Sequence, residues 1–212
     1  MIMRNLLISA ALACALLAGT GLPAQQPPSD SGDRGRTGLI LGVNFTGSFA
    51  TVDGATFEEH TFDSHGREGG GGMFLTLGYA FTPAIGVLLH GGAVALNEEK
   101  ERTLGGVELA LRYSFASSGR SLVPYMEMGL GGFALEDSFE NGSSELAGGS
   151  LSVAGGFNYF VTRRVALNAD FRYYMGMFPT VSVDSRTITD DARMGFSSSR
   201  VNVGLNWYPF AR

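Results

Sequence analysis

From Thr37 onward, apolar and polar side chains alternate with a period of two along successive segments of the chain. Such alternation is typical of β-strands that present one face to an apolar environment and the other to a polar one. The pattern predicts eight strands, at 37–50, 71–81, 84–96, 104–115, 122–135, 147–161, 165–178 and 195–208. Each reaches or exceeds the roughly 9–11 residues that a tilted strand needs to cross a bilayer.

The connections between these segments alternate in length. Short ones are expected at 82–83, 116–121 and 162–164, and mostly longer, polar ones at 51–70, 97–103, 136–146 and 179–194. Short turns at one end and long loops at the other are typical of membrane-spanning β-barrels. No later segment has 18 consecutive apolar residues, so a transmembrane helix is not expected.

The charges within the predicted strands indicate which face meets lipid. In the segment 165–178, Val165, Leu167 and Phe171 share one face, whereas Asp170 and Arg172 lie on the other. All the strand charges fall on the polar parity: Glu108, Arg112, Glu127, Asp170, Arg172 and Arg200. An arginine facing mid-bilayer lipid costs roughly 2–4 kcal/mol, so the apolar face is expected to point outward. The predicted fold is an all-β, eight-stranded, antiparallel up-and-down transmembrane β-barrel.

The N-terminus has the pattern of a secretory signal peptide, with Arg4 ahead of an apolar run at 6–18 and small residues after it. We expect residues 1–24 to be a cleaved signal peptide, 25–36 a flexible leader and 37–212 the barrel domain. Cleavage after Ala24 would remove the only cysteine, Cys14. A lipoprotein signal ending at Cys14 is the alternative.

Composition narrows the classes of partner. The net charge of −5 gives no basic field for nucleic acid. Only 17% of the residues are charged and 44% are hydrophobic, and 31 of the 212 residues are glycines. This composition suits a β protein with many turns and much apolar surface.

The polar face supplies the candidate site, a luminal network of ionisable residues. Its expected members are His90, Glu108, Arg112, Glu127, Asp170, Arg172 and Arg200. Because buried charges must be paired, we interpret this network as structural, filling and closing the lumen. A proton- or substrate-handling site, or a gate in a narrow pore, would use the same residues.

Other candidates for chemistry are weaker. A lipid-deacylating site would need a His–Ser–acid group, and His90 has no serine two positions away, while Ser64 is merely adjacent to His65. The acidic segments match no metal-ligand spacing; their residues are Asp53, Glu58, Glu59, His60, Asp63 and His65, and then Asp184, Asp190 and Asp191. The run Gly69–Gly72 has no Lys-Ser/Thr and no helix after it, so it is not a phosphate loop. We therefore expect no cofactor, no metal and no catalytic residue.

Several motifs, in this order and spacing, resemble the outer-membrane β-barrel domain family of small OmpA/OmpX-type barrels over about residues 37–210. They are Gly78-Tyr79-Ala80-Phe81-Thr82-Pro83, Pro124-Tyr125 with Gly129 and Gly131, Gly156-Phe157-Asn158-Tyr159 with Val165-Ala166-Leu167 and Phe171-Arg172-Tyr173, and Gly204-Leu205-Asn206-Trp207. Family members often end on an outward Phe, which resembles the signal read by the assembly machinery. Here Phe210 is out of phase with Trp207 unless the chain breaks at Pro209.

The resemblance implies a monomeric protein of the outer membrane of a Gram-negative-type bacterium, with outer-membrane lipid or lipopolysaccharide and the barrel-assembly machinery as partners. The expected role is non-catalytic: a structural or surface-interaction protein whose external loops make contacts. A narrow channel or carrier for small or hydrophobic solutes is the second hypothesis, and a lipid A-modifying enzyme is the third.

Overall fold

The computed structural model describes the backbone of residues 36–52, 55–57, 60–62, 65–97, 101–115, 121–139, 142–183 and 186–210. It describes side chains at 36–51, 69–96, 102–115, 121–136, 146–177 and 195–210. All of them belong to one compact unit, Gly35–Arg212. The predicted signal peptide and nearly all of the leader lie outside the described residues, so their boundaries stay predictions. No helix among the described residues is long and apolar enough to cross a membrane.

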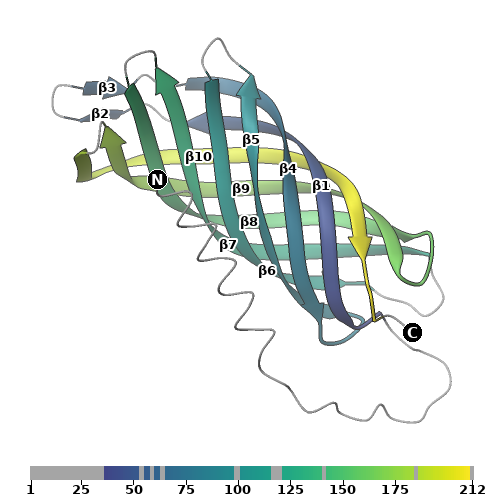
Figure 1. Ribbon diagram of the computed structural model, residues 1–212. Coiled ribbons are helices and arrows are strands. Elements are labelled where there is room, and N and C mark those ends of the chain that lie inside the picture. The colour runs from purple at the N-terminus through teal and green to yellow at the C-terminus, as the bar shows by residue number, and fades with distance from the viewer. Residues whose placement is uncertain are drawn as a thin grey trace. The chain divides into compact units, whose positions relative to one another are not determined.

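Eight strands close into a barrel in which each strand pairs with two antiparallel neighbours (Figure 1). They are β1 (Gly38–Val52), β4 (His65–Ala80), β5 (Ile85–Asn97), β6 (Glu101–Ser114), β7 (Leu122–Phe139), β8 (Gly142–Phe160), β9 (Val165–Val183) and β10 (Arg186–Trp207). Pairing of β1 with β10, from Leu41 opposite Trp207 to Val52 opposite Phe196, closes the barrel. The predicted eight-stranded antiparallel barrel is confirmed, and closure leaves none of the eight strands with an open edge.

The strand boundaries correct the sequence prediction at one end of the barrel. We call this end the loop side, and the end with the connections 81–84, 115–121 and 161–164 the turn side. On the loop side the strands run far into the segments expected to be loops: β9 and β10 are separated by only two residues, 184–185. The segment 51–70 contains the start of β4 and a further hairpin, β2 (Ala55–Phe57) with β3 (His60–Phe62), which we did not predict.

The reason for this error is physical. Polar composition was interpreted as the end of a strand, but a β-ladder is held by backbone hydrogen bonds and continues wherever the neighbouring strand continues. The pairing of Thr187 with Ser182 and of Ile188 with Val181 illustrates this in a segment rich in β-branched residues. The loop side is therefore built mainly from extended hairpins.

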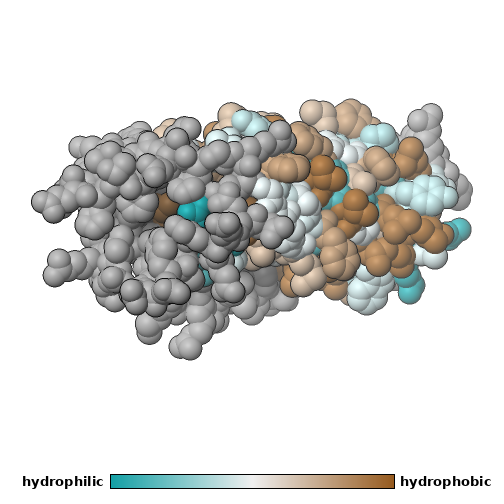
Figure 2. Space-filling view, turned by 90° about the horizontal axis from the view of Figure 1, so that it is seen from above, coloured by the Kyte–Doolittle hydropathy of each residue, from teal (hydrophilic) through white to brown (hydrophobic). Residues whose placement is uncertain are grey.

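The outer face is apolar and the inner face polar, as the alternation predicts. On β7, Met126, Met128 and Leu130 are exposed, with Met128 at 70%, whereas Tyr125 and Glu127 are each 2% exposed. Large apolar side chains cover much of the described surface in Figure 2. Because the exposed face is the apolar one, the barrel is inverted relative to a soluble barrel.

The lumen contains two apolar clusters that the sequence analysis did not predict. The turn-side cluster consists of Ile40, Ala80, Leu88, Val123, Phe160, Ala166 and Tyr208. The loop-side cluster consists of Ala50, Phe74, Val94, Leu96, Leu104, Phe133, Leu135, Leu146, Tyr174 and Phe196. Within it, the Phe133 ring stands edge-on to Tyr174, with 4.9 Å between ring centroids. Apolar side chains thus fill the lumen towards both ends.

Aromatic side chains also surround the turn side on the outer face. The exposed set there is Tyr79, Phe81, Tyr113, Phe115, Tyr159, Trp207 and Phe210. Phe210 faces outward although the strand alternation would point it inward, because a turn at Pro209 and Phe210 breaks the alternation. Phe210 is therefore 70% exposed, while Tyr208 is buried in the turn-side cluster. Aromatic belts of this kind mark the level of the membrane–water interface.

Candidate functional site: a polar layer inside the barrel

The seven residues of the expected luminal network all lie in the lumen, each at most 8% exposed. Strand positions put most of them between the two apolar clusters. On β5, His90 comes between Leu88 of the turn-side cluster and Val94 of the loop-side cluster. On β7, Glu127 comes between Val123 and Phe133 in the same way. We call this middle zone the polar layer.

Glu127 is the centre of the polar layer. Arg112 donates from Nε to Oε1 of Glu127 at 2.6 Å, and its Nη2 lies 2.6 Å from the same oxygen. Arg172 donates from Nη2 to the other oxygen, Oε2. His90 Nε2 lies 3.2 Å from Oε2. One carboxylate therefore holds two guanidinium groups and one imidazole at a site where its own side chain is fully buried.

Arg172 joins this centre to a second carboxylate. Its Nη1 donates to Oε1 of Glu108 at 2.5 Å, and the Ser152 hydroxyl donates to the same oxygen at 2.5 Å. Gly129 makes room for this contact, because a Cβ at position 129 would collide with Oε1 of Glu108 and lie 2.7 Å from Oγ of Ser152. The contact between Glu108 and Ser152 therefore requires a residue without a side chain at position 129.

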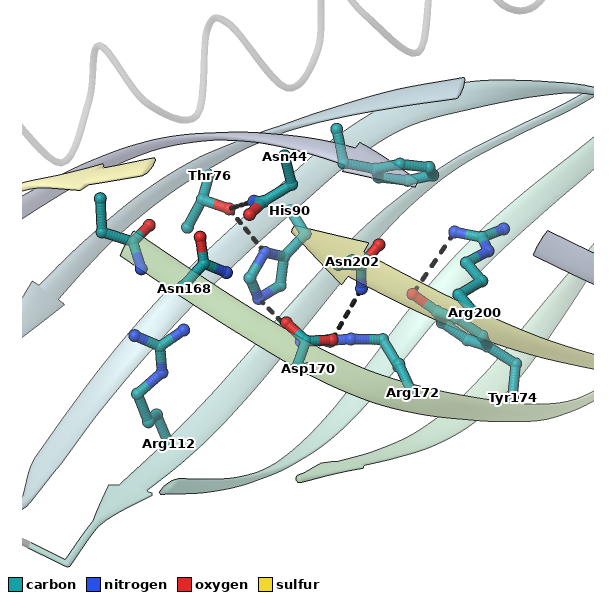
Figure 3. A pocket seen from close by; sticks show the side chains of 12 residues that line it. Asn44, Thr76, His90, Arg112, Asn168, Asp170, Arg172, Tyr174, Arg200 and Asn202 are labelled. Atoms are coloured by element: carbon teal, nitrogen blue, oxygen red, sulfur yellow. Dashed lines mark hydrogen bonds between the residues drawn. The ribbon is translucent and has the colours of Figure 1, made fainter. Parts of the chain in front are cut away.

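His90 is held on both ring nitrogens (Figure 3). Its Nδ1 lies 2.9 Å from Oγ1 of Thr76, and Asn44 Nδ2 donates to that oxygen at 3.1 Å. With the Asn44 amide donating to it, the Thr76 hydroxyl can give its own hydrogen to Nδ1, and Nε2–H then donates to Glu127. The chain of contacts Asn44–Thr76–His90–Glu127 fixes the ring in place.

The order hydroxyl–imidazole–carboxylate in Thr76, His90 and Glu127 has the form of a catalytic triad. Two features argue for a structural role. The carboxylate already pairs with Arg112 and Arg172. The cavity lined in part by Thr76 and His90 has a volume of about 10 Å³, room for about one water molecule. An acyl chain would not fit into this space.

Asp170 lies in the lumen but does not join an arginine. Its Oδ2 accepts the Tyr125 hydroxyl at 3.0 Å and its Oδ1 accepts Nδ2 of Asn202 at 2.7 Å. Thr46 in turn donates to Oδ1 of Asn202 at 2.6 Å. Within the described part of the chain no cationic group comes within ion-pair distance of Asp170, so neutral donors stabilise this carboxylate.

Arg200 is likewise separate from the carboxylates. Its Cζ lies 4.6 Å from the ring centroid of Phe74, 4.5 Å from that of Tyr174 and 5.0 Å from that of Phe133. Nη1 donates to the Tyr174 hydroxyl at 3.4 Å, whereas Nε and Nη2 have no hydrogen-bond partner among the residues that the structure describes. Cation–π contacts with three rings, rather than a salt bridge, stabilise this buried cation. Sequence reasoning could have placed Phe74 and Tyr174 in the lumen, because both lie on the inward parity, but it could not have placed them around Arg200.

The remaining candidates of the sequence analysis fall outside what the structure describes. The residues concerned are Asp53, Glu58, Glu59, Asp63, Ser64 and Asp184, and for His60, His65, Asp190 and Asp191 the side chains alone are not described. Among the residues that are described, no three His, Cys, Asp or Glu side chains are grouped so that they could hold a metal ion.

Three comparisons place the chain among known proteins. In sequence it matches the family described as outer membrane protein beta-barrel domain over residues 12–208. No curated protein matches it.

Among solved structures, the Neisserial surface protein A is similar, with 15% identity and a TM-score of 0.57 over 84% of this chain and 99% of that one. OprG of Pseudomonas aeruginosa has 15% identity and a TM-score of 0.55, over 82% of this chain and 97% of that one. AlkL, determined in DMPC bilayers by solid-state NMR, has 14% identity and a TM-score of 0.50, over 86% and 95%. At such identities the likeness concerns the fold alone. Given the family match over residues 12–208 and the closed barrel with its apolar outer face, the chain belongs to the outer membrane protein beta-barrel domain family and is an outer-membrane protein of Gram-negative type.

Proposed function

We propose that this protein is a non-conducting, non-catalytic outer-membrane barrel, in which the strands provide anchorage and the loop side makes contacts at the cell surface. The observation that carries the proposal is the filling of the lumen by three zones in series. The turn-side cluster, the polar layer and the loop-side cluster follow one another along β5, β7 and β9. We infer that each zone closes the lumen by itself, so that opening one of them would leave the other two closed.

The extended hairpins of the loop side support the surface role. Four segments on this side, 51–70, 97–103, 136–146 and 179–194, together hold fifteen acidic residues and five basic ones. A surface with this excess of negative charge would attract cationic groups and repel polyanions. We include a basic or cation-bridged surface partner in the proposal, together with recognition of the exposed Phe210 by the barrel-assembly machinery and a monomeric state.

Single-channel recording in planar bilayers tests the closed lumen. We expect no conductance steps for the wild type, and none for Arg172→Ala, because the substitution breaks the polar layer but leaves both apolar clusters in place. Gel mobility with and without heating shows that each protein is folded. Steps that appear in Arg172→Ala but not in the wild type would favour the second hypothesis, a narrow channel gated by the Glu127–Arg172 contact.

A pull-down tests surface contact separately. Intact cells or outer-membrane vesicles carrying the full chain are compared with a variant in which the segment 184–185 and the ends of β9 and β10 are shortened to the lipid-facing region. Retention of the same partners by both proteins would contradict a contact role for this hairpin, whatever the result on conductance.

A further inference from the structure

Two buried amide side chains flank Gly204 inside the barrel. In the antiparallel ladders Asn44 of β1 lies opposite Gly204, and Gly204 in turn lies opposite Asn168 of β9. Asn44 is 6% exposed and Asn168 is 4% exposed. An ideal Cβ at position 204 would lie 2.5 Å from Oδ1 of Asn44, so this oxygen occupies the place that a side chain at 204 would take. The glycine therefore lets the Asn44 oxygen lie in the middle of the row, between β1 and β9.

The oxygen atoms of both amides lack a hydrogen-bond donor. Oδ1 of Asn44 and Oδ1 of Asn168 are buried, and neither has a partner among the residues that the structure describes. Nδ2 of Asn44 donates to Oγ1 of Thr76 at 3.1 Å, so this amide is held at its nitrogen only. Figure 3 shows no bond from the Asn168 amide to any other side chain drawn. Because a buried acceptor without a partner destabilises a fold, both oxygens call for a donor.

Both amides line the small cavity of the polar layer (Figure 3). Its volume of about 10 Å³ gives room for about one water molecule. Members of the Glu127, Asp170 and Arg200 contacts all contribute to the same wall, namely His90, Arg112, Arg172, Asp170, Asn202, Tyr174 and Arg200. The cavity thus lies where the three groups of polar contacts meet.

The charges around the cavity favour a neutral occupant. The luminal network has three guanidinium groups and three carboxylates, on Arg112, Arg172, Arg200, Glu108, Glu127 and Asp170. These charges balance when His90 is neutral, so an ion of either sign would add a buried charge without a counter-charge. A cation would also lie among the arginines, and an anion would face the two amide oxygens and the Asp170 carboxylate.

The same wall supplies hydrogen-bond donors. Nη1 of Arg112 and both Nε and Nη2 of Arg200 have no acceptor among the described residues. The lining residues therefore offer two free acceptors for hydrogen atoms and free N–H donors for a lone pair. One water molecule has both capacities, because it carries two hydrogens and two lone pairs.

We propose that one buried water molecule is bound over Gly204, where it donates its hydrogens to Oδ1 of Asn44 and Oδ1 of Asn168 and accepts an N–H from a guanidinium group of the cavity wall. Three bonds of this kind are usual for a buried water. Since β10 lies between β1 and β9, the water bridges the seam at which β1 and β10 close the barrel. It also extends the chain of contacts from Asn44 to Glu127 across to β9.

A crystal structure at a resolution that shows ordered waters, with a second crystal soaked in sodium bromide, tests the proposal. We expect a density peak within hydrogen-bond distance of both Oδ1 atoms, and no anomalous bromine signal there. In Asn168→Leu, which removes one acceptor with little change in side-chain size, the peak should be lost. Asn158→Leu is the matched control, because Asn158 lies opposite Asn168 on β8 but does not line the cavity, and its peak should remain. Heat-modifiable gel mobility shows whether each variant is folded.

Three results would overturn the proposal. The first is a wild-type cavity without density, and the second is an anomalous bromine peak between the two amides, which would make the occupant an anion. The third is a peak that keeps its occupancy in Asn168→Leu, because other groups would then hold the water. The first two results need no variant, so the wild-type crystals decide even if a leucine variant does not fold. None of these outcomes depends on ion conduction or on surface contacts, so the proposed function can fail while the water site stands.

Discussion

Removal of the Glu127 carboxylate is the most informative perturbation of the polar layer. In Glu127→Gln the side chain keeps its shape but loses its charge, and Arg112 loses its only carboxylate partner among the described residues. Arg172 keeps Glu108, through the contact of 2.5 Å from Nη1 to Oε1. Removing one partner of a buried ion pair costs about 3–5 kcal/mol, because the other charge stays buried and uncompensated. We therefore expect Glu127→Gln to lower the free energy of unfolding by about 4 kcal/mol.

Urea unfolding in phospholipid vesicles measures this change, with the fluorescence of the single tryptophan, Trp207, as the signal. Asp170→Asn is the matched control, since the donors to Asp170 are the neutral groups of Tyr125 and Asn202 and its loss should cost about 1–3 kcal/mol. In the double variant Arg112→Met/Glu127→Met both charges are removed, and much of the lost stability should return. A Glu127→Gln variant no less stable than Asp170→Asn, or a double variant no more stable than the single one, would refute the reasoning.

Three further predictions use the two faces of the barrel, and each is measured by the same unfolding assay. Gly129→Ala should lower the free energy of unfolding by about 1–3 kcal/mol, because the added Cβ collides with Glu108. Gly155→Ala should change stability little, because a Cβ there meets nothing within 4 Å. Equal effects of the two substitutions would contradict the crowding around Gly129. Arg200→Met should cost less than Arg172→Met, since Arg200 forms an ion pair with no carboxylate in the described part of the chain. The reverse order would show that the aromatic cage stabilises the cation more strongly than an ion pair. Met128→Arg should lower the free energy of unfolding by about 2–4 kcal/mol, and Val161→Arg, beside the turn, by at most about 1 kcal/mol. A cost at Met128 no larger than that at Val161 would argue against lipid at the level of Met128.

The parity of side chains along the strands could be predicted from sequence because it is a local property. On β7, the assignment of Glu127 to the lumen needed only the alternation with Met126 and Met128, and lipid makes the wrong phase costly. The partners of Glu127 could not be predicted in this way. Arg172 lies 45 residues away and reaches it across the lumen from β9, so the contact depends on register and barrel closure.

The other features that the sequence did not predict have the same origin. Asp170 and Arg200 lie in the lumen as predicted, but parity gives neither the level along the barrel axis nor the neighbour across the lumen, so it did not predict the neutral donors to Asp170 or the aromatic rings around Arg200. The apolar clusters were missed because Phe74, Phe133 and Tyr174 come from three strands and form one group only after closure. The strands were predicted to be too short on the loop side. The polarity of a segment indicates whether its side chains face water, and it does not indicate whether its backbone pairs with a neighbouring strand.

The central claim is that the outer face meets lipid while the lumen is filled and closed. The most direct measurement is a cysteine scan of residues 123–131 on β7 in bilayers, with a spin label at each position and Cys14 replaced if it is retained. Accessibility to oxygen and to a water-soluble nickel complex is read by EPR. We predict oxygen accessibility with a period of two, high at 126, 128 and 130, and low accessibility to both reagents at 125, 127 and 129. Nickel access at the odd positions would contradict the closed lumen, and loss of the two-residue period would contradict the barrel itself.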